Sequence, residues 1–399
     1  MLPVLSNYAA ASGHIETQSG HYNWILQFMK HPGTLENIIV EKIVAEGSIP
    51  FHQFMEMALY YPGLGYYTSG RNRIGESGDY FTSPWFCNLF GEMIARQLIE
   101  MWNLMGRPPF TIVECGGGNG NLCNDILNEL QFEPALYKDL QYFVVEKGSP
   151  DLTTCNSAHH GKVRWIDTLD RLPDIDHGCI LSNELVDNFP VSRVQMEDEL
   201  MEIYVDYQDG FVESLQPASS ELKDYFHHLN IRLTKGHQAE VNLQAIQWLR
   251  DVSHKLHRGF VLTIDYGSLS AELYEPRHRM GTMLCYRRHQ VHDSFYTDIG
   301  EQDITSHVNF SALLHWGKEH GLDCCGYTDQ ANFLLSLGLA DHLKKKEARL
   351  GTQETSGLAR QATMIRSFLS GMGRRFKVLV QNKGIKKPQL SGLRLCFPI

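Results

Sequence analysis

The residues best suited to chemistry lie in a glycine-rich segment between two acids. Gly116, Gly118 and Gly120 alternate after a short apolar run. Glycine at this spacing lets the chain turn sharply out of a strand and approach a ligand without Cβ clashes, with a helix N-terminus behind it. Glu114 stands two residues before the first glycine, and Glu146 ends the next apolar run. The segment therefore predicts a cofactor-binding loop.

The two acids discriminate between cofactor classes. Glu146 can accept both hydroxyls of a ribose, and Glu114 can either hold the loop or meet a methionine ammonium group. A positive sulfonium and ammonium suit this site, which favours S-adenosyl-L-methionine. A dinucleotide site expects G-x-G-x-x-G, but Asn121 occupies the sixth position, and Glu114 would repel a pyrophosphate. A nicotinamide-dependent oxidoreductase and a purely structural glycine turn are the alternatives.

A second polar group follows the fourth expected strand, where a methyl acceptor would approach the donor. It contains Asn183, Glu184 and Asp187. Carboxylates there can orient a guanidinium or an amine, and one can take its proton. Helix capping, with Pro190 as the breaker, is the competing interpretation. His307 is a further candidate, either as a base near neutral pH or as a hydrogen-bonded structural histidine.

Short apolar runs ending in polar residues predict a buried parallel sheet that positions these groups. The runs alternate with helical or loop segments, as in α/β folds, and open α/β sheets bind ligands at the carboxyl ends of their strands. Asp167 ends one run and joins the expected cofactor contacts. The expected strands are 111–114, 141–146, 163–167, 179–182, 259–265 and 376–381, with a helix through Asp125, Ile126 and Leu130.

Flanking segments are expected to pack around this core. We expect a helix over 34–46, a shaped tyrosine-rich loop over 60–67, and an amphipathic helix from Ser83 through Leu98. A β-meander over 192–215 and a helix over roughly 240–256 indicate an inserted flap or lobe. The expected division is an N-terminal helical region with the tyrosine loop (1–109), the first part of the core (110–190), the inserted lobe (191–258) and the remainder of the core (259–399).

Composition and charge restrict the partners and the compartment. A formal charge of -10 argues against an extended nucleic-acid footprint and favours a protein or small-molecule substrate. Nine cysteines without paired C-x-x-C spacing imply a reducing compartment and no metal site. No apolar stretch approaches the ~20 residues of a membrane span. The first thirty residues lack the arginines of a transit peptide, so we expect a cytoplasmic protein that binds neither nucleic acid nor membrane.

An ordered series of motifs resembles the MidA family, class I methyltransferases related to the mitochondrial complex I assembly arginine methyltransferase. The resemblance runs from about Ile49 to Lys383, and the combination is specific although each motif alone is not. Its motifs are Gly65-Tyr66-Tyr67, Gly78–Pro84, Phe90-Gly91-Glu92, Glu114-x-Gly-x-Gly-x-Gly, Val145-Glu146, Asn183-Glu184-x-x-Asp187-x-x-Pro190, Ile264–Gly267, Gly300–Val308 and Gly371–Leu379.

The resemblance implies a Rossmann-like class I methyltransferase fold, a seven-stranded, mostly parallel sheet with helices on both faces. It also implies S-adenosyl-L-methionine as donor, S-adenosyl-L-homocysteine as product and, in the mitochondrial member, an arginine of a complex I subunit as acceptor. Contact with the cofactor is carried onto Gly116, Gly118, Glu146 and the loop Asp79–Ser83. Asn183, Glu184 and Asp187 are placed at the reaction pocket.

We therefore expect a methyltransferase acting on a protein side chain, with the ω-nitrogen of arginine as the favoured acceptor. A respiratory-complex subunit is the candidate partner, a homodimer is the candidate assembly, and a catalytically inactive donor-binding assembly factor is the alternative. The expected catalytic residues are Asn183, Glu184, Asp187 and His307, and the expected cofactor contacts are Asp79, Thr82, Ser83, Glu114, Gly116, Gly118, Gly120, Asn121, Glu146 and Asp167.

The chain also departs from the family pattern. Gly117 stands where the family usually has proline, and Trp85 and Asn88 stand where it usually has glutamate and glutamine. Lys147-Gly148 lengthens the segment after Glu146. These differences leave donor binding intact and bear on the identity of the acceptor.

Overall fold

The computed structural model describes residues 33–70, 88–148, 159, 161–349, 369 and 371–398. In this part of the chain, one sheet has the strand order β15-β16-β10-β5-β2-β3-β4, and β14 pairs with β10. β10, β5, β2, β3 and β4 are parallel, whereas β16 is antiparallel to both of its neighbours. The strands are β2 (Thr111–Cys115), β3 (Gln141–Val145), β4 (Val163–Ile166), β5 (Ile175–Asn183), β10 (Leu256–Ser268), β14 (Val308–Asn309), β15 (Asp323–Asp329) and β16 (Phe376–Lys383).

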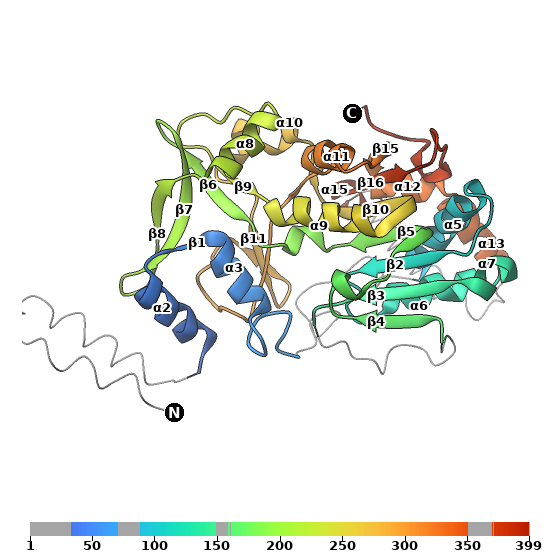
Figure 1. The fold of residues 1–399 in the computed structure, drawn as a ribbon, viewed down its shortest axis with the longest axis horizontal. Coiled ribbons are helices and arrows are strands. Elements are labelled where there is room, and N and C mark those ends of the chain that lie inside the picture. The colour runs from blue at the N-terminus through green and yellow to red at the C-terminus, as the bar shows by residue number, and fades with distance from the viewer. Residues whose placement is uncertain are drawn as a thin grey trace, which may run out of the picture.

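This order confirms the expected Rossmann-like α/β fold with a mostly parallel seven-stranded path. Helices cover both faces of the sheet because alternate residues of its strands face opposite sides (Figure 1). Ile112 packs with α5 (Leu89–Leu104) and α6 (Asn121–Leu130), whereas its neighbour Val113 packs with α9 (Leu243–Lys255) and α11 (Phe310–Glu319). The expected strands are therefore present, and β5 and β10 extend beyond their expected bounds.

The segment after β5 forms a second sheet. β6 (Ser192–Met196), β7 (Leu200–Tyr207) and β8 (Phe211–Pro217) confirm the expected meander. The following helix begins later than expected, because Glu240 belongs to β9 (Gln238–Val241) and pairs there with Arg193 of β6. Asn242 then caps α9, its side chain accepting the Ala245 N–H at 2.8 Å. α8 (Ser220–His228) lies between β8 and β9, and the short β1 (Ile49–Pro50) pairs with β7.

The N-terminal helices pack against this second sheet. α2 (Leu35–Glu46) confirms the helix expected over 34–46, and Thr34 caps it by accepting the Asn37 N–H at 3.3 Å. α3 (Phe51–Tyr60) was not expected; its buried Phe51 and Phe54 join the core around Val205 of β7. The tyrosine-rich turns follow directly, so α3 fixes where that loop starts. The helix expected from Ser83 appears as α5, and Ser83 itself lies outside the described residues.

Smaller elements complete the described chain. β11, β12 and β13 form a three-stranded sheet beside the tyrosine-rich turns, sharing a core with α3. None of the described helices combines the length and apolarity needed to cross a bilayer. The remaining elements are α7 (Pro134–Asp139), η3 (Leu169–Arg171), η4 (Val186–Asn188), α10 (Ser270–Leu273), η5 (Pro276–His278), β11 (Leu284–Arg287), β12 (Gln290–His292), β13 (Asp303–Thr305), α12 (Gln330–Ser336), α13 (Leu339–Arg349), α15 (Met372–Arg375) and η6 (Ser391–Leu393).

Candidate functional site

The glycine loop leaves the carboxyl end of β2 and leads directly into α6. Gly116, Gly118 and Gly120 have φ angles of 76°, 53° and 78°, in the left-handed region that favours glycine. The Gly116 N–H donates to the Val145 carbonyl at 2.8 Å, which anchors the loop to the end of β3. A Cβ at Gly117 would lie 2.2 Å from Val144 Cγ1. The loop therefore packs closely against β3 at Gly117, where a side chain has no room, and Asn121 begins the helix behind the loop.

Glu146 connects this loop to the segment after β3. Its Oε2 accepts the Gly118 N–H at 2.8 Å, and its Oε1 accepts the Gly148 N–H at 2.9 Å. An ionised carboxylate has about four acceptor positions, so these two bonds leave others available for hydroxyl donors. The structure thus brings the second acid to the glycine loop, where the sequence interpretation requires it.

Glu114 lies beneath the same loop in a buried environment. Its side chain accepts the Tyr142 hydroxyl at 2.6 Å, and its exposed fraction is 2%. Burial raises the pKa of this carboxyl to about 8, although the hydrogen bond from Tyr142 opposes the shift. At neutral pH the folded protein therefore holds Glu114 mainly in its protonated form. This placement suits the loop-holding role more directly than contact with an ammonium group.

The remaining expected cofactor contacts have different positions. Asp167 follows β4 at the same edge of the sheet, is exposed, and forms an ion pair with Arg171 at 3.1 Å. Asp79, Thr82 and Ser83 lie outside the described residues.

The acceptor-side group begins where β5 ends, and it touches the glycine loop. Asn183 Nδ2 donates to Glu184 Oε1 at 3.0 Å. Glu184 has a φ of 53°, which is uncommon for a residue with a side chain, and strained backbone of this kind clusters at functional sites. A Cβ on Gly116 would lie 2.9 Å from Leu185 Cδ1. The two sequence motifs therefore meet in space.

Asp187 carries an unsatisfied buried carboxylate oxygen. Its exposed fraction is 3%, and its Oδ1 has no hydrogen-bond partner among the described residues. Burial raises the pKa of Asp187 well above its usual range, and the nearby charges of Asp265, Asp303 and Glu184 raise it further. These four carboxyl groups define the carboxylate cluster. A cationic ligand would relieve both the mutual repulsion and the missing hydrogen bond.

Two members of the carboxylate cluster were not among the expected site residues. Asp265 Oδ2 accepts the backbone N–H groups of Leu185, Val186 and Asp187 at 3.2, 2.8 and 3.3 Å. Asp303 accepts the Tyr67 hydroxyl at 2.9 Å. The position of Asp265 at the end of an expected strand was a usable signal. Asp303 lies in the Gly300–Val308 motif that carried the family resemblance, although its strand β13 belongs to a sheet that the sequence did not predict.

The tyrosine-rich turns lie between Glu146 and the carboxylate cluster. Tyr60 stacks on Tyr67 with ring centroids 5.4 Å apart, and its hydroxyl donates to the Asn188 carbonyl at 3.3 Å. Burial raises the pKa of Tyr60, and Asp303, Glu146 and Asp187 act in the same direction. Tyr60 therefore lies within electrostatic reach of both halves of the site.

His307 has surroundings of another kind. Burial lowers its pKa to about 4, with His278 and Arg375 contributing in the same direction, so it is neutral at physiological pH. The charged groups that act most on it also include Glu272 and Lys377, and none of them belongs to the carboxylate cluster. Among the expected catalytic residues, Asn183, Glu184 and Asp187 thus lie together, and His307 follows Ser306, whose N–H donates to the Asp187 carbonyl at 2.9 Å.

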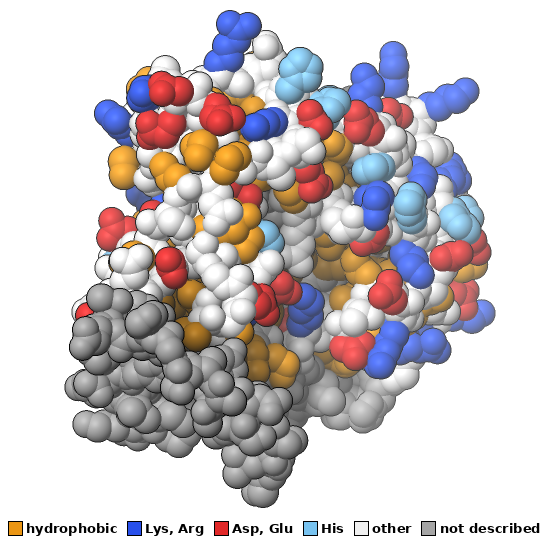
Figure 2. Space-filling view, turned by 60° about the vertical axis from the view of Figure 1, so that its left-hand side comes forward, with side chains coloured by type: hydrophobic (Ala, Val, Ile, Leu, Met, Phe, Trp, Pro, Cys, Tyr) orange, Lys and Arg blue, Asp and Glu red, His pale blue; other side chains and the backbone are white. Residues whose placement is uncertain are grey.

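The charge on one face of the molecule is mixed. Figure 2 shows acidic and basic side chains interspersed where side chains are described.

Comparison with known proteins identifies the class to which this geometry corresponds. Residues 93–328 match the sequence model of a family described as "Putative S-adenosyl-L-methionine-dependent methyltransferase". A Burkholderia thailandensis protein of the COG1565 superfamily, crystallised with S-adenosyl-homocysteine, is 29% identical, with 94% of this chain and 97% of that chain covered and a TM-score of 0.82. These matches support the expected resemblance, the fold and the cofactor.

Curated relatives carry a more specific name. The Drosophila melanogaster "Protein arginine methyltransferase NDUFAF7 homolog, mitochondrial" is 27% identical, with 88% of this chain and 86% of the relative covered. The Homo sapiens "Protein arginine methyltransferase NDUFAF7, mitochondrial" is 26% identical, with 77% of this chain and 74% of the relative covered.

The expected cytoplasmic location is wrong. The matching curated relatives are named as mitochondrial proteins. The expectation rested on the composition of the first thirty residues and on cysteine spacing, and neither feature excludes a mitochondrial location.

Proposed function

Since this chain belongs to the family of S-adenosylmethionine-dependent methyltransferases that its residues 93–328 match, we propose that its acceptor is an arginine ω-nitrogen of a protein. The observation that carries the proposal is the unpartnered, buried Oδ1 of Asp187 within the carboxylate cluster. A guanidinium keeps its positive charge at any physiological pH and presents several N–H donors in a plane, so it matches several carboxylates better than a point charge does.

The proposal assigns separate tasks to the two halves of the site. Gly116, Gly118 and Glu146 would hold the nucleoside part of the donor, which supplies an electrophilic methyl group when bound. Glu184 and Asp187 would orient the guanidinium, and one of them would take the proton that the nitrogen loses. Asn183 would hold Glu184 through the 3.0 Å hydrogen bond between their side chains.

The names of the relatives support the substrate class and the location. Both the fly and the human relative are called protein arginine methyltransferases and mitochondrial. We therefore propose a mitochondrial protein as the substrate of this chain, with a subunit of a respiratory complex as the candidate. A homodimer remains the candidate assembly, to be measured by light scattering of the purified protein.

The experiment that tests the proposal uses donor labelled in its methyl group. The purified chain is incubated with this donor and with mitochondrial protein from cells that lack the chain, and the protein is hydrolysed to amino acids. Label in methylarginine is the expected result. Label confined to methyllysine would overturn the arginine assignment.

A variant pair separates activity from protein quality. Glu184→Gln should abolish most labelling, whereas Asp176→Asn, at a side chain that is 86% exposed, should leave it intact. Absence of labelling by the unmodified chain, with S-adenosylhomocysteine binding retained, would favour the inactive assembly factor instead.

A further inference from the structure

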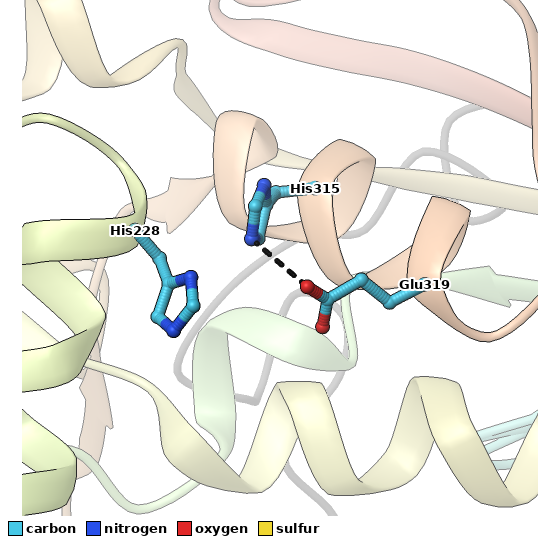
Figure 3. A group of neighbouring side chains, drawn as sticks. All are labelled: His228, His315 and Glu319. Carbon is cyan, nitrogen blue, oxygen red and sulfur yellow. Dashed lines mark ion pairs between the residues drawn. The ribbon is translucent and has the colours of Figure 1, made fainter.

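We propose that His228, His315 and Glu319 form a binding site for a divalent transition-metal ion such as Zn²⁺. Their ligand atoms all lie within 4.8 Å of one another. His228 ends α8, whereas His315 and Glu319 lie one turn apart on α11. Figure 3 shows the three side chains gathered between these two helices. The site is outside the methyl-transfer site and is not used by it.

The spacing on α11 already has the geometry of half a zinc site. Residues four apart project from the same face of a helix. His315 Nε2 and Glu319 Oε1 are 3.4 Å apart. Zinc bonds of about 2.0–2.1 Å in a tetrahedron place neighbouring ligand atoms ~3.4 Å apart, so this pair needs little movement to share one ion.

The chemistry of His315 also favours a ligand. Its Nε2 is buried and makes no hydrogen bond among the described residues, although Glu319 Oε1 lies at ion-pair distance from it. A neutral imidazole nitrogen is the commonest metal ligand in proteins, and a bound ion would satisfy this atom. Two imidazoles and one carboxylate form a nitrogen and oxygen set that suits Zn²⁺, with water available for the fourth position because His228 and Glu319 are exposed.

Buried contacts hold the two helices in place beneath the cluster. Asn309 accepts the Ser311 N–H at 3.1 Å at the start of α11, and its Nδ2 donates to the Tyr225 hydroxyl of α8 at 2.8 Å. Tyr225 in turn stacks on Trp316 of α11 with ring centroids 5.2 Å apart. The packing of α8 against α11 therefore sets the backbone positions of the three proposed ligands.

A metal at this place would tie the inserted lobe to the core. α8 belongs to the lobe built on the second sheet, whereas α11 covers one face of the main sheet. This proposal departs from the sequence-based prediction of no metal site, which rested on the spacing of the cysteines. His315 and Glu319 are four residues apart, which alone is a weak signal for a metal site, and His228 comes from a distant segment that only the fold brings to them.

Zinc titration of the full-length protein tests the proposal. After removal of metals with a chelator, calorimetry with ZnCl₂ should show one ion per chain, and bound Zn²⁺ should raise Tm by a few degrees. His315→Ala and Glu319→Gln should each weaken binding by at least about tenfold, since even residues that only orient metal ligands contribute about that much. His257→Ala, at an exposed histidine beside Asp176, is the matched control and should bind zinc as the unmodified chain does.

S-adenosylhomocysteine affinity, measured on the same samples, checks that each variant is folded. Equal zinc affinity in the unmodified chain, His315→Ala and Glu319→Gln would overturn the proposal, as would a titration without saturable binding.

Discussion

Asp265, near the end of β10, accepts the backbone N–H of Val186 at 2.8 Å and thereby fixes the turn that follows β5. The same carboxylate oxygen accepts the N–H groups of Leu185 and Asp187, and its other oxygen accepts the Tyr266 N–H at 2.9 Å. One buried side chain therefore satisfies four backbone donors. It holds the backbone of Leu185 to Asp187, next to the proposed acceptor contacts Glu184 and Asp187.

Removing the Asp265 carboxylate should destabilise the fold. In Asp265→Ala four backbone donors lose their acceptor, which should lower the free energy of unfolding by at least about 3 kcal/mol. Asp265→Asn keeps one acceptor oxygen, so its free energy of unfolding should lie between that of the unmodified chain and that of Asp265→Ala. Urea unfolding measures both. Asp176→Asn is the exposed control, and an Asp265→Ala protein as stable as this control would contradict the assigned role.

Glu114 should make stability depend on pH. Its pKa is raised from 4.5 to about 8 in the folded protein, so between these values the folded state holds a proton that the unfolded state has released. Its contribution to the free energy of unfolding must then fall as pH rises, by at most roughly 1.4 kcal/mol per pH unit. Glu114→Gln removes this pH-dependent contribution while keeping an acceptor for the Tyr142 hydroxyl.

Urea unfolding at pH 5, 6.5 and 8 compares the two proteins. The stability of Glu114→Gln relative to the unmodified chain should increase at each step. A constant difference across this range would mean that Glu114 does not carry its proton in the folded state.

Glu146 should be required for donor binding. Glu146→Ala removes the acceptor of the Gly118 and Gly148 N–H groups together with the proposed ribose contacts. Hydrogen bonds to a charged group contribute about 1.5–3 kcal/mol, so affinity for S-adenosylhomocysteine should fall at least about tenfold in calorimetry. Asp170→Ala, at an exposed acid near the same edge of the sheet, should bind normally. Retained affinity in Glu146→Ala would remove Glu146 from the donor site.

Glu184 should affect turnover and not donor affinity. Glu184→Gln keeps the size of the side chain but removes the charge that would orient a guanidinium or accept its proton. Groups in this role typically contribute 10²–10⁴-fold, so kcat should fall by at least about 100-fold. The dissociation constant of S-adenosylhomocysteine should stay within about twofold of the unmodified value. Unchanged turnover would show that the pocket assignment is wrong.

Much of the architecture could be read from local sequence. Alternating glycines, the acids at Glu114 and Glu146, and apolar runs of strand length are properties of neighbouring residues, and the structure has the corresponding elements. The predicted start of α9 was too early, because Glu240 lies in β9 and pairs with Arg193 of β6. Helical periodicity does not reveal such a contact between distant segments.

Local sequence was sufficient for the class of fold, the glycine loop and the acids at the ends of its strands, because these depend on backbone conformation and on the period of apolar residues. Long-range packing, in contrast, brings Asp265 and Asp303 to Asp187, Tyr67 to Asp303 and His228 to His315. These residues belong to segments far apart in the chain. Their proximity follows from strand order and from the packing of loops and helices against the sheets, and no run of neighbouring residues encodes it.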